Sequence, residues 1–423
     1  MAIIELENFG FTYAGTERSV LSSITLDVRG GEFVLVCGKS GCGKTTLLRN
    51  LKKEIAPVGK TEGAVRICGL AELTPRQSAT LVGFVMQDPD NQIVMDSVWL
   101  ELAFGLENLG IPSEEIGRRI GEISAFFGID SWFGKKVEEL SGGQKQILSL
   151  AAVIAMQAEI IVLDEPTAQL DPIAAKEFLH MLMRVNTELG KTVILSEHAL
   201  EEVFSMSDKV LYMDGGEVKY FGDTKGFTLA LAPDDNYYPA LPSPARLAMR
   251  LDASSIPLDV REGRSWLLNY ADLRSLRSRY DEAATVSPPK KPAEKIPFAL
   301  RAKGIWFRYS AHDDFVLKGL DAEIAENSLH IFVGGNGSGK STLLRVLAGV
   351  RKPFRGKVAA ATGARVTMLS QDPKSVFVCE ALREEFAEHA SSVTAEGSAE
   401  LIKRLGLESL LDRHPYDLSA GEM

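Results

Sequence analysis

Apolar positions along the chain recur with two different periods, and the changes between them mark strands and helices. In residues 3–9 and 20–28 apolar residues alternate with polar ones, as at Ile24, Leu26 and Val28. This period of two predicts half-exposed antiparallel strands, with Tyr13 in the turn between them. Further strands are predicted at 33–37, 82–86, 159–165, 192–196, 209–213 and 217–221, the last two forming a hairpin through 214–216.

Helical periodicity fills the intervals between these strands. A helix is predicted over 97–109, and another from Ser113, whose apolar face of Ile116, Ile120 and Phe127 ends at Gly128. Asp171 followed by proline is a strong helix start, and this helix runs to Gly190. Because buried strands and helices alternate, we expect an α/β core with an antiparallel ribbon at its start.

A glycine-rich turn lies between the strand at 33–37 and the helix marked by Leu47, Leu48 and Leu51. Residues 38–45 read G-K-S-G-C-G-K-T and fit the phosphate-binding P-loop pattern G-x-x-x-x-G-K-[S/T]. Glycines allow several backbone N–H groups to point into one concavity, and the following helix presents its positive end. The predicted phosphate-binding residues are Gly38, Lys39, Ser40, Gly41, Cys42, Gly43, Lys44, Thr45 and Thr46.

The same motif returns in the second half of the chain. Tyr13 precedes Lys44 by 31 positions, and Tyr309 precedes Lys340 by 31 positions. An apolar run at 329–333, predicted to be a strand, leads into this second loop. The corresponding residues are Gly334, Gly335, Asn336, Gly337, Ser338, Gly339, Lys340, Ser341 and Thr342.

The repeat predicts three parts: a first domain at 1–225, an accessory segment and linker at 226–296, and a second, partial domain at 297–423. Asp259 and Glu262 have capping-box spacing and predict a helix toward Tyr280. Residues 287–292 read S-P-P-K-K-P, which is typical of a solvated linker.

Composition limits the possible partners. The net charge is −10, which disfavours nucleic acid as the main partner. The most apolar window, 147–163, contains Gln157 and Glu159 and is short for a membrane span, so we expect any membrane role to be peripheral.

Four further motifs follow the first P-loop in a fixed order. They are Gln87, the L-S-G-G-Q run at 140–144, Asp164-Glu165 at the end of an apolar run, and His198. With this order and spacing the chain resembles an ATP-binding cassette (ABC) ATPase, one whole cassette followed by part of a second. Residues 86–94 and 103–110 are similar to the ATPase subunits of energy-coupling factor (ECF) transporters, importers of vitamins, metal ions and related micronutrients. The second copy lacks the D-N-Q-I-V residues of 90–94, as a diverged partner cassette would.

This resemblance implies ATP and Mg²⁺ as ligands and assigns a role to each motif. Tyr13 stacks on adenine, and Thr45, Gln87 and Asp164 surround Mg²⁺. The expected catalytic residues are Glu165, which activates water, His198, which holds Glu165 against the γ-phosphate, and Gln87. The turn of Ser141, Gly142, Gly143 and Gln144 binds the nucleotide of an opposite cassette, in a head-to-tail pair within or between chains, with Asp171 at the seam. In the second cassette the resemblance adds Ser341 and Gln371 as metal ligands and Tyr309, Ser419 and Gly421 as nucleotide contacts.

The implied partners are a transmembrane coupling protein and a substrate-binding membrane protein, which place the chain at the cytoplasmic face of the membrane. Val94, Met95 and Trp99, near the Gln87 loop, are expected to contribute an exposed apolar docking surface. A soluble double-cassette ATPase acting on ribosomes or DNA is the alternative; it would be expected to carry a strongly basic arm or zinc-finger cysteines. A catalytically silent regulatory cassette is disfavoured for the first copy by Glu165 and His198.

The second cassette is expected to be incomplete as given. In the first cassette Ser141 precedes Asp164 by 23 positions, and the same step from Ser419 passes Met423. We therefore expect a partial sequence, a loosely folded 297–423 and a stable, nucleotide-competent 1–225.

Overall fold

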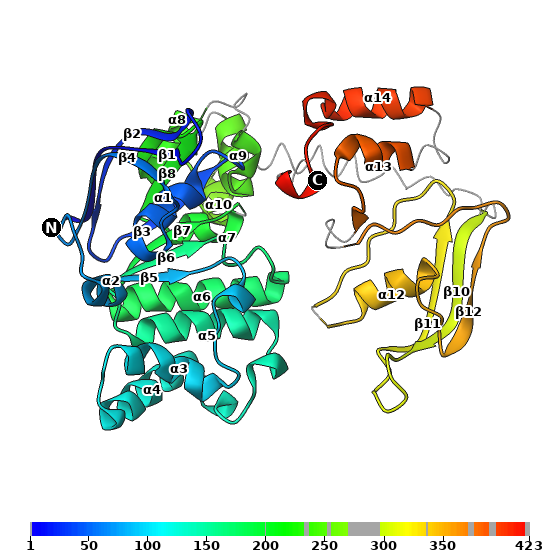
Figure 1. The fold of residues 1–423 in the computed structure, drawn as a ribbon, viewed down its shortest axis with the longest axis horizontal. Coiled ribbons are helices and arrows are strands. Elements are labelled where there is room, and N and C mark those ends of the chain that lie inside the picture. Colours follow the sequence, from blue (N-terminus) through cyan, green and yellow to red (C-terminus); the bar gives the residue numbers. More distant parts are fainter. Residues whose placement is uncertain are drawn as a thin grey trace. The chain divides into compact units, whose positions relative to one another are not determined.

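The computed structural model describes residues 2–198, 200–231, 237–251, 255–269, 297–335, 337–370, 376–388 and 395–418. The chain divides into two compact units, 1–289 and 290–423 (Figure 1). The described helices of the accessory segment belong to unit 1. The predicted boundaries at 225 and 296 stay predictions.

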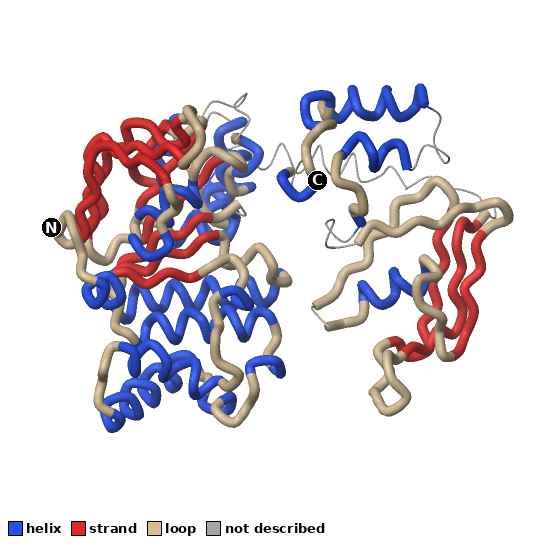
Figure 2. Tube along the Cα trace, viewed as in Figure 1, coloured by secondary structure: helices blue, strands red, loops and turns tan. Residues whose placement is uncertain are grey.

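Unit 1 is built on two sheets, whose strands are red in Figure 2. The smaller is antiparallel, in the order β2-β1-β4, and the larger has the order β5-β6-β7-β3-β8-β9, parallel except at β9. Tyr13 is the last residue of β1 and not part of the following turn, since its backbone pairs with Gly59 of β4. The strands are β1 (Ala2–Tyr13), β2 (Ser19–Arg29), β3 (Phe33–Gly38), β4 (Gly59–Ile67), β5 (Val82–Val85), β6 (Ile160–Asp164), β7 (Thr192–Ser196), β8 (Lys209–Asp214) and β9 (Glu217–Asp223).

The helices of unit 1 begin and end largely where the sequence predicts. Gly128 and Gly190 end α4 and α6 in the left-handed conformation, and Asp171 caps α6 through the N–H groups of Ile173 and Ala174. The helices are α1 (Lys44–Asn50), α2 (Pro75–Leu81), α3 (Val98–Asn108), α4 (Ser113–Phe127), α5 (Gly142–Ala155), α6 (Pro172–Leu189), α7 (Leu200–Val203), α8 (Thr224–Ala230), α9 (Ser243–Arg250) and α10 (Val260–Asn269).

The larger sheet is buried on both faces, which explains why its strands read as continuous apolar runs. In β3, Val34 and Val36 face a core shared with the smaller sheet and α1. Phe33, Leu35 and Cys37 face the opposite core, which the helices α3 to α6 cover. The P-loop therefore begins at the end of a central strand that packing holds from both sides.

Unit 2 repeats the first part of this arrangement. Its antiparallel sheet has the order β11-β10-β12, formed by β10 (Phe298–Phe307), β11 (Leu317–Ala325) and β12 (Arg355–Ala360). The helix α12 (Lys340–Leu347) follows the second P-loop and packs on this sheet through Leu343, Val346 and Leu347. The helices α13 (Leu382–Glu388) and α14 (Ala395–Leu405) complete the described part of the unit.

The predicted strand at 329–333 is wrong, because the segment lies outside any strand. In unit 1 the matching strand β3 pairs with β7 on one side and β8 on the other. No strand among the described residues of unit 2 takes either place. Leu329, Ile331 and Val333 are accordingly 89%, 76% and 86% exposed.

Candidate active site

The first P-loop closes around the side chain of Lys44, its next-to-last residue. Lys44 is buried, and its ammonium donates to the carbonyl oxygens of Gly38 and Lys39 at 2.9 and 3.2 Å. At Gly38 the backbone φ is 148°, and a Cβ would lie 2.2 Å from the Met213 carbonyl oxygen, so only glycine fits there. The loop thus closes around its own lysine, which is the group able to reach a phosphate.

Three hydroxyl and carboxyl groups meet beside the loop, at the carboxyl ends of neighbouring strands. The Thr45 hydroxyl donates to Asp164 Oδ1 at 3.1 Å, and the Ser196 hydroxyl donates to the same oxygen at 3.0 Å. Asp164 and Ser196 are direct partners in the register of β6 and β7. Burial raises the pKa of the Asp164 carboxyl, and the two hydroxyl donors oppose that shift.

Glu165 follows the end of β6 in an uncommon conformation. Its φ of 47° is left-handed, a region that side chains other than glycine adopt at a cost of about 1–3 kcal/mol. Its N–H donates to Ser196 Oγ at 3.0 Å, and its carboxylate Oε1 lies 2.8 Å from His198 Nε2. The hydrogen bond from His198 is the main reason that the pKa of Glu165 lies below its ordinary value. The structure therefore brings together two residues that a helix and a strand, α6 and β7, separate in the sequence.

The loop that carries His198 is held by a buried carboxylate. Glu197 accepts from the His198 N–H at 3.1 Å and from the hydroxyl of Thr167, two residues after Glu165. Burial raises the pKa of Glu197, and these donors oppose it. Neither Ser196 nor Thr167 was identified from the sequence. The place of Ser196, directly before Glu197-His198 at a strand end, was a signal that could have indicated it.

The tyrosines that precede the two P-loops have the same surroundings. Tyr13 and Thr46 share a hydrogen bond of 2.9 Å between their hydroxyls, and so do Tyr309 and Thr342. Each ring packs edge-on against the aromatic residue two positions earlier, at 5.1 Å between centroids. Tyr13 is 38% and Tyr309 51% exposed, which leaves ring area for a ligand.

The Gln87 loop is fixed through its neighbours. Gln87 itself is exposed, while the Met86 carbonyl oxygen accepts from the fully buried Gln146 of α5 at 2.9 Å. Glu101 of α3 is buried and accepts from the N–H groups of Val94 and Met95 at 3.0 and 2.9 Å. These hydrogen bonds hold the loop at both ends, and the Gln87 side chain takes no part in them.

The turn at 141–144, called the signature turn below, is held by hydrogen bonds between its own residues. The Ser141 hydroxyl accepts from the Gln144 N–H, and the Gln144 side chain accepts from the Ser141 N–H, which is a capping box at the start of α5. A Cβ on Gly143 would lie 2.8 Å from the Cβ of Ala174, so this glycine allows α5 to approach α6. None of these contacts reaches the P-loop of the same unit, and the turn remains available at the surface.

The second P-loop keeps the geometry of the first. The Lys340 ammonium donates to the carbonyl oxygens of Gly334 and Gly335, both at 2.8 Å. Four predicted residues lie outside the described part of the chain, namely Asn336, Gln371, Ser419 and Gly421.

The two copies share a local contact that the sequence did not predict. Glu385 of α13 is buried and accepts from the N–H groups of Val378 and Cys379, as Glu101 does in unit 1. Gln87 precedes Glu101 by 14 positions and Gln371 precedes Glu385 by 14. The second copy therefore differs from residues 90–94 in sequence but keeps the length of that segment.

Comparisons with known proteins show the family of this chain. A family model described as ABC transporter matches residues 21–168 and 317–423. A Bacillus anthracis protein bearing the name of an ABC transporter ATP-binding protein is 39% identical over 439 residues, which cover 100% of this chain and 78% of that protein. The chain belongs to the ABC transporter ATP-binding family.

Two further relatives of this ABC transporter ATPase have more specific names. YkoD of Bacillus subtilis (strain 168), named for HMP/thiamine import, is 31% identical over 441 residues, covering 99% of this chain and 77% of that protein. The solved structure of cbiO1 from Clostridium perfringens, titled as part of the ABC transporter complex cbiONQ, is 28% identical with a TM-score of 0.50. It covers 59% of this chain and 96% of its own, and it supports the predicted ABC-type P-loop fold.

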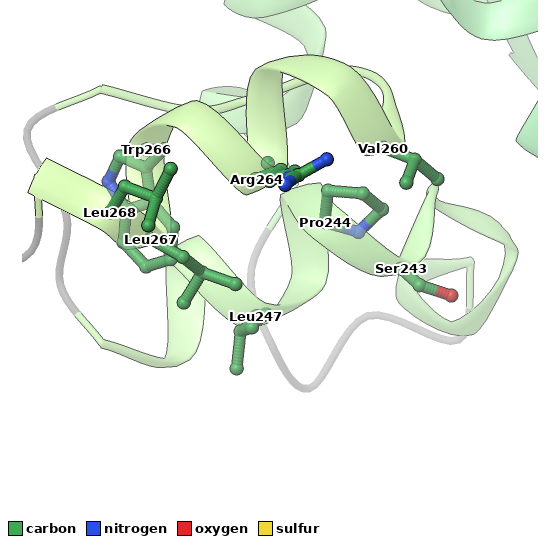
Figure 3. A pocket seen from close by; sticks show the side chains of 9 residues that line it. Ser243, Pro244, Leu247, Val260, Arg264, Trp266, Leu267 and Leu268 are labelled. Atoms are coloured by element: carbon green, nitrogen blue, oxygen red, sulfur yellow. The ribbon is translucent and has the colours of Figure 1, made fainter. Parts of the chain in front are cut away.

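Two further observations concern parts of this ABC ATPase away from the P-loops. No helix in the described part of the chain has the length and apolar character to cross a bilayer. An apolar pocket of about 490 Å³ lies between α9 and α10 of the accessory segment, lined by side chains such as Pro244, Leu247 and Trp266 (Figure 3). It contains none of the predicted nucleotide or metal residues.

Proposed function

We propose that this ABC ATPase hydrolyses ATP at the site of unit 1 and drives an ECF-type importer of a vitamin, metal ion or related micronutrient. The observation that carries the hydrolytic part is the Asp164-Glu165 pair beside the P-loop, with Thr45 on one carboxylate and His198 on the other. Adjacent carboxylates held in different environments suit different tasks, one at a cation and one at water.

Glu165 is the proposed general base. Its lowered pKa keeps it ionised near neutral pH, and the contact with His198 fixes the direction of its carboxylate. The left-handed backbone at Glu165 turns this side chain away from the direction that the strand would give it. Such local strain is typical of residues whose placement serves function.

The donor set of unit 1 fits Mg²⁺. Thr45 offers a hydroxyl, Asp164 a carboxylate and Gln87 a carboxamide, and oxygen ligands of this kind are the ones Mg²⁺ prefers alongside nucleotide phosphates. The ion, when bound, would neutralise charge on the transferred phosphoryl group. Thr45 Oγ1 and Asp164 Oδ1 are only 3.1 Å apart, so both can face one small cation.

The signature turn is proposed to serve a second cassette. Gly142 and Gly143 place their backbone N–H groups in the first turn of α5, where the helix dipole favours an anion. Within the described part of the chain, the signature turn makes no contact with the P-loop of its own unit. This supports a head-to-tail pair in which the turn of each cassette completes the nucleotide site of the other. Asp171, at the start of α6, is proposed to lie at that seam.

The ECF assignment rests on residues 86–94 and 103–110 and on the names of the relatives. YkoD is named for HMP/thiamine import, and cbiO1 is titled as part of a transporter complex. By analogy we assign to this chain a transmembrane coupling protein and a substrate-binding membrane protein as partners, and a position at the cytoplasmic face of the membrane.

The proposed docking surface is an apolar patch formed by Val94, Trp99, Leu100 and Phe104, which are 62%, 39%, 45% and 36% exposed. Met95, which the sequence suggested for this surface, is partly buried. A groove of about 550 Å³ between α2 and α3, lined in part by Phe104, Asn108 and Met156, continues the patch. Exposed apolar area of this kind is typical of a protein interface.

The test is reconstitution. The tagged chain, isolated from detergent-solubilised membranes, should bring along a multi-span protein and a small substrate-binding protein. Vesicles containing this complex should accumulate a labelled thiamine precursor or divalent metal only when ATP is inside with the cassette. Recovery of the chain with ribosomes, and with no membrane protein, would contradict the importer assignment while leaving ATP hydrolysis intact.

A further inference from the structure

Tyr237 of the accessory segment reaches the P-loop with its side chain. This residue precedes a short turn at Tyr238–Ala240, and it is buried in the core of unit 1. Its hydroxyl accepts a hydrogen bond of 3.1 Å from the N–H of Gly38, which lies 199 positions earlier. Gly38 is both the last residue of β3 and the first residue of the P-loop.

The two sides of Gly38 are therefore held by two different groups. Its N–H donates to Tyr237, and its carbonyl oxygen accepts from the ammonium of Lys44 at 2.9 Å. The Lys44 ammonium has three N–H groups, and two of them are held here by the carbonyl oxygens of Gly38 and Lys39. The contact between Tyr237 and Gly38 does not depend on Lys44, so it fixes the starting direction of the loop whether or not the lysine contacts a phosphate.

The environment of the Tyr237 hydroxyl suits this task. Burial raises the pKa of Tyr237, so the phenol stays neutral and can donate and accept at once. It also forms a hydrogen bond with the thiol of Cys37, whose pKa burial raises to about 12. The ring stacks near Tyr212 of β8, with 5.0 Å between centroids. The hydroxyl is thus fixed by the ring packing and serves two neighbouring residues of β3.

We propose that Tyr237 is a positioning residue for ATP binding, through which the accessory segment sets the geometry of the first P-loop. The proposal rests on ATP binding by unit 1. Removing the hydroxyl leaves a buried N–H without a partner, which the loop can relieve only by turning away from its phosphate-binding shape. Glu165, the proposed general base, follows the end of a different strand, β6, so hydrolysis of bound ATP is not directly affected.

Tyr237→Phe in the full chain tests this, because it removes one oxygen and keeps the ring. Tyr238→Phe is the matched control: Tyr238 is the next residue and is also buried, and its hydroxyl donates to the Arg246 carbonyl oxygen of α9 at 2.9 Å. We expect Tyr237→Phe to raise the Kd and KM for ATP about fivefold, equivalent to about 1 kcal/mol, with kcat within twofold of wild type. Tyr238→Phe should leave Kd and KM unchanged.

Three other results would contradict the positioning role of Tyr237. An unchanged Kd in Tyr237→Phe, with wild type binding ATP normally, would overturn the positioning role alone. Equal effects of both substitutions would mean that the hydroxyls act only through stability, which the thermal midpoints of the two variants would show. A wild-type chain that does not bind ATP would overturn the proposed function as well.

Discussion

His198 Nε2 lies 2.8 Å from Glu165 Oε1, although the helix α6 and the strand β7 separate them in the chain. The contact exists because β6 and β7 run parallel as neighbours, so that both residues leave the sheet at the same edge. Residues at this edge of an open α/β sheet are the ones able to meet a ligand together. The predictions for the ATP site follow from this pairing.

Glu165→Gln should nearly abolish hydrolysis while keeping ATP affinity. The amide keeps the shape of the side chain but cannot accept a proton from water, and general bases contribute about 10²–10⁴-fold. Phosphate release and equilibrium ATP binding would be measured together. Glu188→Gln is the control, because Glu188 is an exposed partner of Arg184 on α6. Full hydrolysis by Glu165→Gln would remove this residue from the catalytic role.

Ser196→Ala should lower both stability and turnover. The Ser196 hydroxyl donates to Asp164 and accepts from the N–H of Glu165. Its loss removes one of the two hydroxyl donors to the buried Asp164 carboxylate and leaves the Glu165 N–H with only the Ser196 carbonyl oxygen. We expect about 1–3 kcal/mol less stability in urea unfolding and a fall in kcat. Ser207→Ala, which removes one buried hydrogen bond to Val203, should lose stability only. If kcat survives in Ser196→Ala, the hydroxyl does not order the two carboxylates.

Val94→Glu and Leu100→Glu should weaken association with membrane subunits and spare the ATPase activity of the isolated chain. Both side chains are exposed, so a charge costs little in the free chain, but it would be desolvated in an apolar interface. Pull-down from detergent extracts and ATPase assays would be compared with Leu70→Glu, an equally apolar position outside the patch that is 40% exposed. Intact association in both variants would place docking elsewhere.

Hydrogen exchange should distinguish the two units. Val34–Val36 lies in a central strand paired on both sides, while residues 329–333 of unit 2 lie outside any strand. Amides of 329–333 should exchange within seconds, and those of 34–36 should be protected by orders of magnitude. Equal protection at the two segments in the purified chain would refute this.

Local sequence signals predicted the fold of unit 1 well. Helix ends follow from residues such as Asp171, Gly128 and Gly190, which satisfy backbone groups locally and so leave a mark in the sequence. The strand predicted at 329–333 failed for the opposite reason. Its apolar pattern is that of a buried strand, but a strand exists only with its partners, and pairing is a long-range property.

In the candidate site, too, residues of local motifs could be predicted and residues defined by long-range contacts could not. Lys44, Asp164 and Glu165 belong to short motifs, so the sequence could indicate them. Tyr237 belongs to none, because its partner Gly38 lies 199 positions away and no local pattern records the contact. Glu101 was missed for a related reason: a glutamate inside a helix looks like a solvated residue until its burial is known.

The two buried glutamates at the starts of α3 and α13 have a consequence for how this chain can change. Each carboxylate receives two consecutive backbone N–H groups, a contact that depends on the count of residues from the glutamine loop and hardly on their side chains. Substitutions between Gln87 and Glu101 should therefore be tolerated far better than a single insertion or deletion, which would move the N–H pair off the carboxylate. That tolerance gives the loop freedom to acquire new surface chemistry, and so new membrane partners, while the nucleotide site behind it keeps its geometry.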